Sequence, residues 1–209
     1  MKKPSIILVF LVTFASSAFA QDNMFSTSGF VALKNAYVLD NGYAPNDEPV
    51  TQVDIFLKHT SGAYIDLWGS VGLTRSDQNE IDILIGYAGE IRGIDFKIDL
   101  PYYEIKGGID MTAPLVEFYP AKGWSTGAQY FFGTAGDQGK KFWAGYTKGA
   151  WSAQVSYTDF FGRVTAVKGA WVYPFSKDVS ASLTAIVPIA DPDNTGNDTR
   201  IIAAVQWTF

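Results

Sequence analysis

The stretch that decides the fold is the last ten residues of the chain, RIIAAVQWTF, from Arg200 to Phe209. Apolar and aromatic side chains occupy every second position of this stretch: Ile201, Ala203, Val205, Trp207 and Phe209. Alternation with a period of two is typical of a β-strand whose two faces meet different surroundings. The chain is therefore predicted to end in a strand with one apolar face.

The other end of the chain has the three parts of a secretory signal peptide. A cationic start at Met1 to Lys3 precedes an apolar run from Ile6 to Ala15, and Ala18 to Ala20 forms an A-x-A cleavage site. We expect residues 1–20 to be removed and residues 21–209 to form one domain. A membrane-anchoring helix is the alternative, but an apolar run of about ten residues is too short to span a bilayer.

The composition is unusual for a soluble domain. Charged residues make up 18% of the chain and aromatic residues 15%, and there is no cysteine. Soluble domains carry about a quarter charged residues, so much of the outer surface is expected to face something other than water. The net charge of −5 makes nucleic acid an unexpected partner.

Twelve segments show period-two alternation and are predicted as strands, and no helix is predicted after the signal. They are residues 28–38, 50–59, 63–73, 80–88, 94–103, 109–119, 124–132, 141–147, 151–158, 164–173, 179–188 and 200–209. Even-numbered connections are tight, whereas several odd-numbered ones, such as residues 39–49 and 189–199, are longer and more polar. Outer-membrane barrels have short periplasmic turns and longer outer loops.

The predicted fold class is thus all-β, a transmembrane antiparallel up-and-down barrel of about twelve strands with both termini in the periplasm. A soluble barrel or sandwich shows the same alternation with the apolar set turned inward. The export signal, the asymmetric connections and the aromatic residues near strand ends favour the membrane alternative.

Several segments of the first half resemble the TorF-like putative porins of proteobacteria. They are residues 37–42 (YVLDNG), 49–52 (PVTQ), 62–70 (GAYIDLWGS), 80–82 (EID) and 86–89 (GYAG). The resemblance implies an outer-membrane barrel of presumed pore function, with Phe209 read as an assembly signal by the barrel assembly machinery. This chain departs from the family around Asp40, where a more basic or polar segment is expected.

Strand parity predicts which charges point inward. Seven acids and five bases have inward parity: Asp54, Asp66, Glu80, Asp82, Asp95, Asp99 and Glu117, with Lys34, Lys58, Lys97, Lys168 and Arg200. A tight turn at residues 89–93 is expected to bring Lys97 opposite or diagonal to Asp82, with Asp99 close by. The candidate pore-lining residues are Asp54, Asp66, Trp68, Glu80, Asp82, Asp95, Lys97, Asp99 and Glu117.

Two interpretations of these charges stay open. They either line a narrow water-filled lumen or pair into a network that rigidifies the barrel. Twelve strands fall between the small barrels that side chains fill and the large ones that hold a channel. The expected function is a passive diffusion channel for small hydrophilic solutes and ions with weak cation preference, and the alternative is a non-conducting structural or surface-interaction barrel.

Enzyme activity and metal binding are not expected. The only histidine, His59, falls at a predicted periplasmic turn, away from the outer rim. The oxygen-rich segment from Asp191 to Asp198 lacks the ligand pattern of an EF-hand loop and is predicted as a solvated loop. We expect no cofactor. The expected partners are outer-membrane lipid, lipopolysaccharide, the barrel assembly machinery and small solutes.

Overall fold

The computed structural model describes residues 24–209 except 41, 75–78, 107–109, 135, 137, 161 and 194–197. The predicted signal at residues 1–20 lies outside the described residues, so its removal stays a prediction. The strands are β1 (Phe25–Lys34), β2 (Val50–His59), β3 (Ala63–Gly72), β4 (Glu80–Ile91), β5 (Ile94–Ile105), β6 (Met111–Thr112), β7 (Leu115–Tyr119), β8 (Trp124–Gly133), β9 (Gln138–Lys148), β10 (Trp151–Thr158), β11 (Val164–Pro174), β12 (Val179–Ala190) and β13 (Arg200–Thr208).

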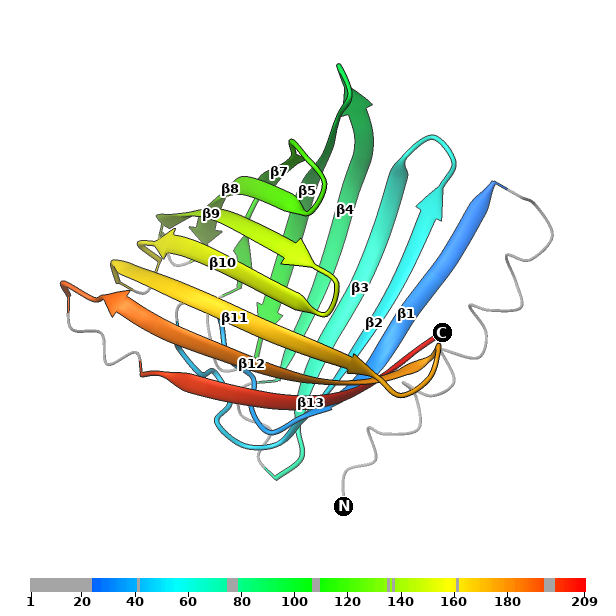
Figure 1. Cartoon of the computed structure of the whole chain (residues 1–209). Coiled ribbons are helices and arrows are strands. Elements are labelled where there is room, and N and C mark those ends of the chain that lie inside the picture. The colour runs from blue at the N-terminus through cyan, green and yellow to red at the C-terminus, as the bar shows by residue number, and fades with distance from the viewer. Residues whose placement is uncertain are drawn as a thin grey trace.

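The strands form one closed ring (Figure 1). Every neighbouring pair is antiparallel, and β1 closes the ring against β13 with Val31 opposite Trp207. The two short segments β6 and β7 form one wall strand, because Tyr103↔Met111 and Asp99↔Leu115 continue a single register along β5. The fold is therefore a twelve-strand antiparallel barrel, which confirms the predicted class. In the described part of the chain, no helix is long and apolar enough to cross a membrane.

Two prolines cause the interruption between β6 and β7. Pro114 has no N–H to donate to β8, and Pro101 has none to donate to Ala113 across the other edge. The amide of Gln129 on β8 takes the place of the second missing donor, since its Nε2 lies 3.3 Å from the Ala113 carbonyl oxygen. A side chain thus completes the backbone pairing where the wall strand breaks.

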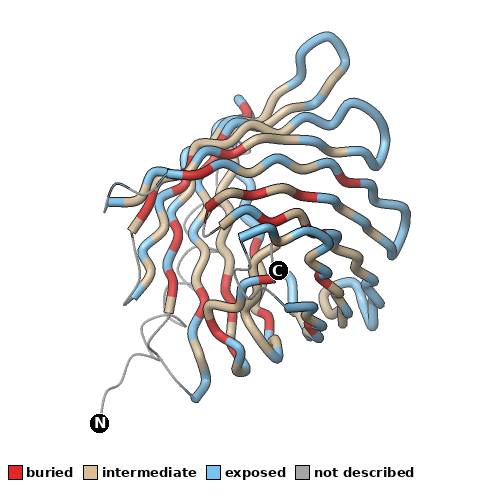
Figure 2. Tube along the Cα trace, turned by 90° about the vertical axis from the view of Figure 1, so that its left-hand side faces the viewer, coloured by how far each residue is buried: buried red, intermediate tan, exposed pale blue. Residues whose placement is uncertain are grey.

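The two faces of the barrel differ as the alternation predicts. On β4, Ile81, Ile83 and Ile85 are 58%, 44% and 60% exposed, whereas Glu80 and Asp82 are 4% and 7% exposed. The same alternation of exposed with buried or half-buried positions runs along the other strands (Figure 2). Apolar side chains therefore cover the outside of the barrel, and most charged strand residues point inward.

The two ends of the barrel also differ. We call one the short-turn end, because it carries the tight connections and the chain's C-terminus. Its β4–β5 turn has only two residues, Arg92 and Gly93, both with positive φ (53° and 80°), as a type I′ hairpin requires. At the seam, the Gly29 N–H donates to the Phe209 carbonyl and the Phe209 N–H to that of Gly29, both at 3.1 Å. The opposite, long-loop end carries the remaining connections.

One predicted strand is displaced. The first strand was predicted over residues 28–38 and is observed at Phe25–Lys34. The chain leaves the wall at Asn35, whose side-chain Oδ1 accepts from the Ala203 N–H at 2.9 Å and whose Nδ2 donates to the Ile201 carbonyl at 3.2 Å. This side chain replaces backbone pairing with β13, and the residues after it turn into the barrel.

Candidate functional site in the barrel lumen

All nine predicted pore-lining residues occupy inward-facing strand positions. Their surroundings differ along the barrel axis. Asp95 is exposed at the short-turn end, whereas Asp99, Glu80 and Asp82 are buried and the remaining five are partly buried. The inward positions thus hold charges both in contact with open water and enclosed by other side chains.

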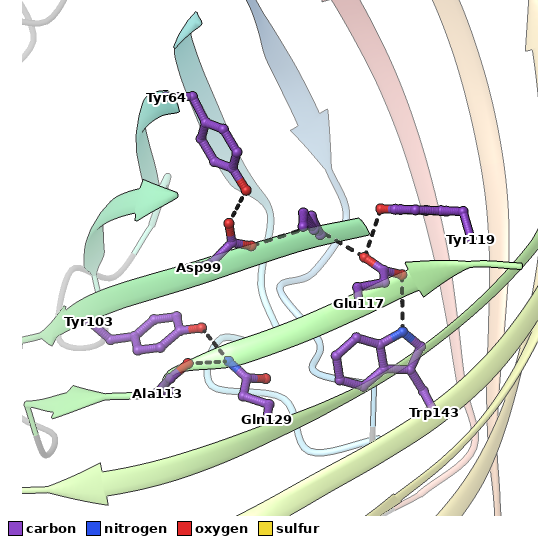
Figure 3. Close-up of polar contacts among 9 residues, drawn as sticks. Tyr64, Asp99, Tyr103, Ala113, Glu117, Tyr119, Gln129 and Trp143 are labelled. Carbon is purple, nitrogen blue, oxygen red and sulfur yellow. Dashed lines mark hydrogen bonds and ion pairs between the residues drawn. The ribbon is translucent and has the colours of Figure 1, made fainter. Parts of the chain in front are cut away.

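Lys97 connects β5 and β7 in the part of the wall that carries the inward acids of β2 to β7, here called the acidic wall. Its Nζ lies 3.5 Å from Asp99 Oδ2 and 3.3 Å from Glu117 Oε2 (Figure 3). The sequence prediction that Lys97 would lie beside Asp82 is wrong, since Lys97 pairs with Ala88 and Asp82 with Tyr103. The cause is the two-residue turn, which is shorter than predicted and lets β4 continue to Ile91.

Glu117 and Asp99 have further donors around them. Glu117 accepts hydrogen bonds from the Tyr119 hydroxyl at 2.9 Å and from the Trp143 indole N–H at 3.1 Å. Trp143 reaches Glu117 from β9 by lying over Gly127, where a Cβ would collide with the Trp143 ring. The Tyr64 hydroxyl donates to Asp99 (Figure 3). This part of the wall is a connected polar network.

Two further acid pairs lie on the neighbouring strands β2 to β4. The carboxyl groups of Asp54 and Asp66 are within hydrogen-bonding contact, and so are those of Glu80 and Asp82. Among the described residues, Oδ1 of Asp66 and Oδ1 of Asp82 have no hydrogen-bond partner. Two carboxylates in contact repel each other when both are ionised.

The connection after β1 folds into the lumen. Its residues 37–40 and 42–46, here called the inner hairpin, pair through Tyr37 N to Asn46 O at 2.7 Å and Leu39 N to Tyr43 O at 2.8 Å. Residues 39–49 were predicted as an outer loop, and the structure instead places the inner hairpin between the walls. Polar pairing inside the hairpin satisfies the backbone groups that would otherwise stay unpaired there.

Both faces of the inner hairpin contact the wall. The Tyr37 ring lies 5.4 Å from the Trp68 ring, and the Tyr37 hydroxyl bonds to Glu80. Burial and the nearby Glu80 raise the pKa of Tyr37 well above its ordinary value. On the other side, Val38 packs against an apolar cluster on the inner face of β11, β12 and β13, made of Val164, Ala166, Ile186 and Ile202.

Asp40 of the inner hairpin reaches a basic sector of the wall. Its Oδ2 lies 2.5 Å from Lys141 Nζ and its Oδ1 lies 2.6 Å from Lys168 Nζ. Gln154 Nε2 donates to the same Oδ2 at 3.3 Å. Burial alone would raise the pKa of Asp40, but the charges and hydrogen bonds of the two lysines outweigh burial and lower it. Asp40 is thus held as a carboxylate.

Sequence reasoning missed several of these residues. Lys141 and Trp143 share the inward parity of β9 with Gly145, against the outward Phe142, Ala144 and Tyr146, so their alternation was a usable signal. No pattern in the sequence indicates that Asp40 turns inward, because a polar residue in a long connection is typical of a solvated loop.

The residues weighed for enzyme and metal chemistry lie elsewhere. His59 is at the short-turn end, where its Nδ1 lies 2.8 Å from the Ser61 hydroxyl. At the long-loop end, Asp193 accepts from Arg163 Nε and Nη2 at 3.0 and 2.5 Å. These hydrogen bonds lower the pKa of Asp193 to about 2. The other half of the predicted Asp191–Asp198 loop lies largely outside the described residues.

Comparison with known proteins supports the fold. No protein-family model and no curated protein matches the sequence, so the TorF-like resemblance stays a prediction. A KdgM porin matches with a TM-score of 0.61 at 10% identity, over 87% of this chain and 99% of the porin. A KdgM porin in complex with disordered oligogalacturonate gives 0.59 at 9%, over 88% and 99%. A NanC porin gives 0.52 at 10%, over 86% and 98%. At such identities the match establishes architecture: this chain has the barrel fold seen in these porins.

Proposed function

We propose that this chain is an outer-membrane, porin-like channel through which small hydrophilic solutes and ions diffuse passively, with a weak preference for cations. The observation that carries the proposal is a closed barrel with an apolar outer face and charged residues along its inner face. Closure leaves the wall without an open sheet edge, as hydrocarbon requires. Inward charges then supply a path for water and ions.

The orientation follows from the two ends. The short-turn end, which holds Phe209 and the tight connections, faces the periplasm, and the long-loop end faces outward. The export signal at residues 1–20 and recognition of Phe209 by the barrel assembly machinery belong to the same proposal. Lipid and lipopolysaccharide are the partners expected around the outer face.

The cation preference rests on the charges that remain unneutralised. Asp95 is exposed at the short-turn end, and the Asp54–Asp66 pair is half-exposed. Three inward lysines in contrast are engaged: Lys97 is held by two carboxylates, and Lys141 with Lys168 is held by Asp40. The preference is weak because so much of the wall is internally paired.

The rival function, a non-conducting structural or surface-interaction barrel, is favoured by one observation. The inner hairpin fills part of the lumen with packed side chains. Refolded protein in a planar bilayer with a salt gradient distinguishes the two. The channel proposal expects discrete single-channel steps and a reversal potential of the sign for cation preference. Protein that inserts as a heat-modifiable barrel but never conducts would establish the rival.

The porin folds found by comparison support a channel and not an enzyme. His59, the residue most suited to general base catalysis, is at the short-turn end and is not part of the polar network around Lys97 or of the basic sector around Asp40.

A further inference from the structure

The inner wall carries a receptor for one carboxylate. Three donors from three adjacent strands, Lys141 on β9, Gln154 on β10 and Lys168 on β11, converge on the two oxygens of Asp40 at 2.5, 3.3 and 2.6 Å. Gln154 and Lys168 are directly opposite each other in the β10–β11 register. Two charge-assisted hydrogen bonds and an amide donor are the arrangement that binds a carboxylate strongly.

The receptor and its occupant belong to different parts of the molecule. Lys141, Gln154 and Lys168 belong to strands that are paired on both sides, and the Trp143 ring lies 5.4 Å from Lys141 Nζ. Asp40, in contrast, arrives on the inner hairpin, which the wall holds only through side-chain packing and a few polar contacts. The donors therefore stay in place whether or not Asp40 is bound.

We propose that Lys141, Gln154 and Lys168 form a binding site for the carboxylate of small acidic solutes, and that Asp40 occupies this site as a tethered competitor until such a solute displaces it. The proposal rests on the proposed channel function only for the route by which a solute enters the lumen. Displacement would also release the inner hairpin from the basic sector and widen the path beside it.

Another anion, and not a change of pH, is the agent that removes Asp40. The lysines lower the pKa of Asp40 below its ordinary value of 3.8, so the residue stays ionised at any pH above about 4. Only screening by salt or competition by a second carboxylate therefore weakens the contact.

The tether sets the concentration at which competition occurs. A group held by a short linker acts at an effective concentration on the order of millimolar. Close packing of the hairpin further restricts the movement of Asp40. Gly42 has a φ of +89°, and a Cβ added to it would lie 2.8 Å from the Asp198 carbonyl oxygen and 3.1 Å from Pro188. If Asp40 leaves the site free less than a tenth of the time, removing its carboxylate tightens solute binding by about tenfold or more.

Titration calorimetry of the refolded barrel in micelles tests this. The probe is succinate at constant ionic strength, with uncharged succinamide as the control for size. Asp40→Asn should bind succinate at least about tenfold more tightly than the wild type, and neither should bind succinamide. Asp47→Asn removes an exposed charge from the same connection and should bind as the wild type does. Lys141→Gln combined with Lys168→Gln should abolish binding.

Equal binding by the wild type and Asp40→Asn, or no binding by a folded Asp40→Asn barrel, would overturn the proposal. A heat-modifiable gel band establishes that each variant is folded. Hydrogen exchange on the wild type gives a test that needs no variant. Succinate, but not succinamide, should speed exchange at the Tyr37 and Leu39 N–H groups, which the inner hairpin protects. Unchanged protection at the highest succinate concentration that leaves the barrel folded would also overturn it.

These measurements separate the site from the channel. Binding in micelles requires no current, so a barrel that binds succinate but never conducts would overturn the proposed function and leave the site standing. A barrel that conducts while Asp40→Asn binds no succinate would overturn the site and leave the channel standing.

Discussion

Gln129 is predicted to be the side chain on which the broken wall strand depends. Pro101 has no N–H for the Ala113 carbonyl, and Ala113 has no exposed surface. The Gln129 Nε2 supplies a hydrogen bond to this carbonyl at 3.3 Å and another to the Tyr103 hydroxyl at 2.9 Å. Substituting Gln129→Met keeps the length of the side chain and removes both donors.

The loss of stability in Gln129→Met follows from the carbonyl and the hydroxyl that the substitution leaves without a donor. A buried carbonyl without a donor costs about 1 to 3 kcal/mol, and a lost neutral hydrogen bond about 0.5 to 1.5 kcal/mol. Because the methionine thioether packs well, we expect Gln129→Met to lower the free energy of unfolding by about 2 to 3 kcal/mol. Gln138→Met, the same change at an exposed position bonded to Tyr130, should cost less than about 0.5 kcal/mol.

Urea unfolding of the barrel refolded into vesicles, followed by tryptophan fluorescence, measures these differences. A double-mutant cycle with Pro101→Ala isolates the mechanism, because alanine at this position restores a backbone N–H that can bond to the Ala113 carbonyl. Gln129→Met should therefore cost less in the Pro101→Ala background than in the wild type. An equal cost in both backgrounds would refute the substitution of a side-chain donor for the missing backbone donor.

Three further predictions concern the lumen and its closure. The double substitution Asp82→Asn with Asp99→Asn should shift the reversal potential toward anion preference in a low-salt gradient. The shift should be much smaller at 1 M salt, because the Debye length there is about 3 Å and the remaining charges are screened. An unchanged reversal potential in conducting channels would reject an acidic lining. Deleting Phe209 removes the seam bonds to β1 and a ring contact of about 1 to 2 kcal/mol, so insertion into vesicles should fall further than for Phe175→Ala, a 62% exposed aromatic. Because the pKa of Asp40 is lowered, the stability that its carboxylate gives to the docked hairpin is complete above about pH 4 and is lost only as the pH falls through the lowered value. Hydrogen exchange should therefore show the inner hairpin docked throughout the range from about pH 8 to 5. Undocking near pH 6 would contradict this.

The wall of the barrel was predictable because its signal is local. Val50–His59 and Trp151–Thr158 match their predicted bounds without change. Each residue of a strand faces either the outside or the lumen, and the polarity of its side chain indicates which of the two it faces. The seam was predictable for the same reason, as the alternating set Ile201, Ala203, Val205 and Trp207 of the last strand faces outward.

The lumen was only partly predictable, because its contacts are not local. Parity placed Asp99 and Glu117 correctly, and Asp99 lies close to Lys97 as expected. A β4–β5 turn two residues long instead of five, however, puts Ala88 and not Asp82 opposite Lys97. The contact of Lys97 with Glu117 comes from the separate β5–β7 register. A small change in turn length displaces every cross-strand pair of a hairpin, whereas the period-two pattern within each strand still marks which residues face inward.

The inner hairpin was not predictable because its neighbouring residues contact opposite walls of the lumen. Tyr37 and Val38 continue the alternation of β1, which led to a strand that was too long, yet they pack on opposite walls of the lumen. In the sequence, Asp40 has the character of a solvated loop residue. Its partners Lys141 and Lys168 lie 101 and 128 positions further along the chain. Only the closed ring brings these groups together.

In the proposed channel, the position of Asp40 would link ion selectivity to the position of the connection between β1 and β2. With Asp40 in its site, Lys141 and Lys168 are neutralised by a carboxylate of the chain, and the acids of β2 to β5 dominate the field inside the lumen. With Asp40 displaced, the same two lysines face the acidic wall, and a low-dielectric surround focuses the field between the two sectors. A solute carboxylate that takes the place of Asp40 restores the neutral state. The proposed cation preference and the proposed binding of acidic solutes are therefore compatible in one lumen, because each bound carboxylate, whether tethered or free, leaves the acidic residues of β2 to β5 in excess.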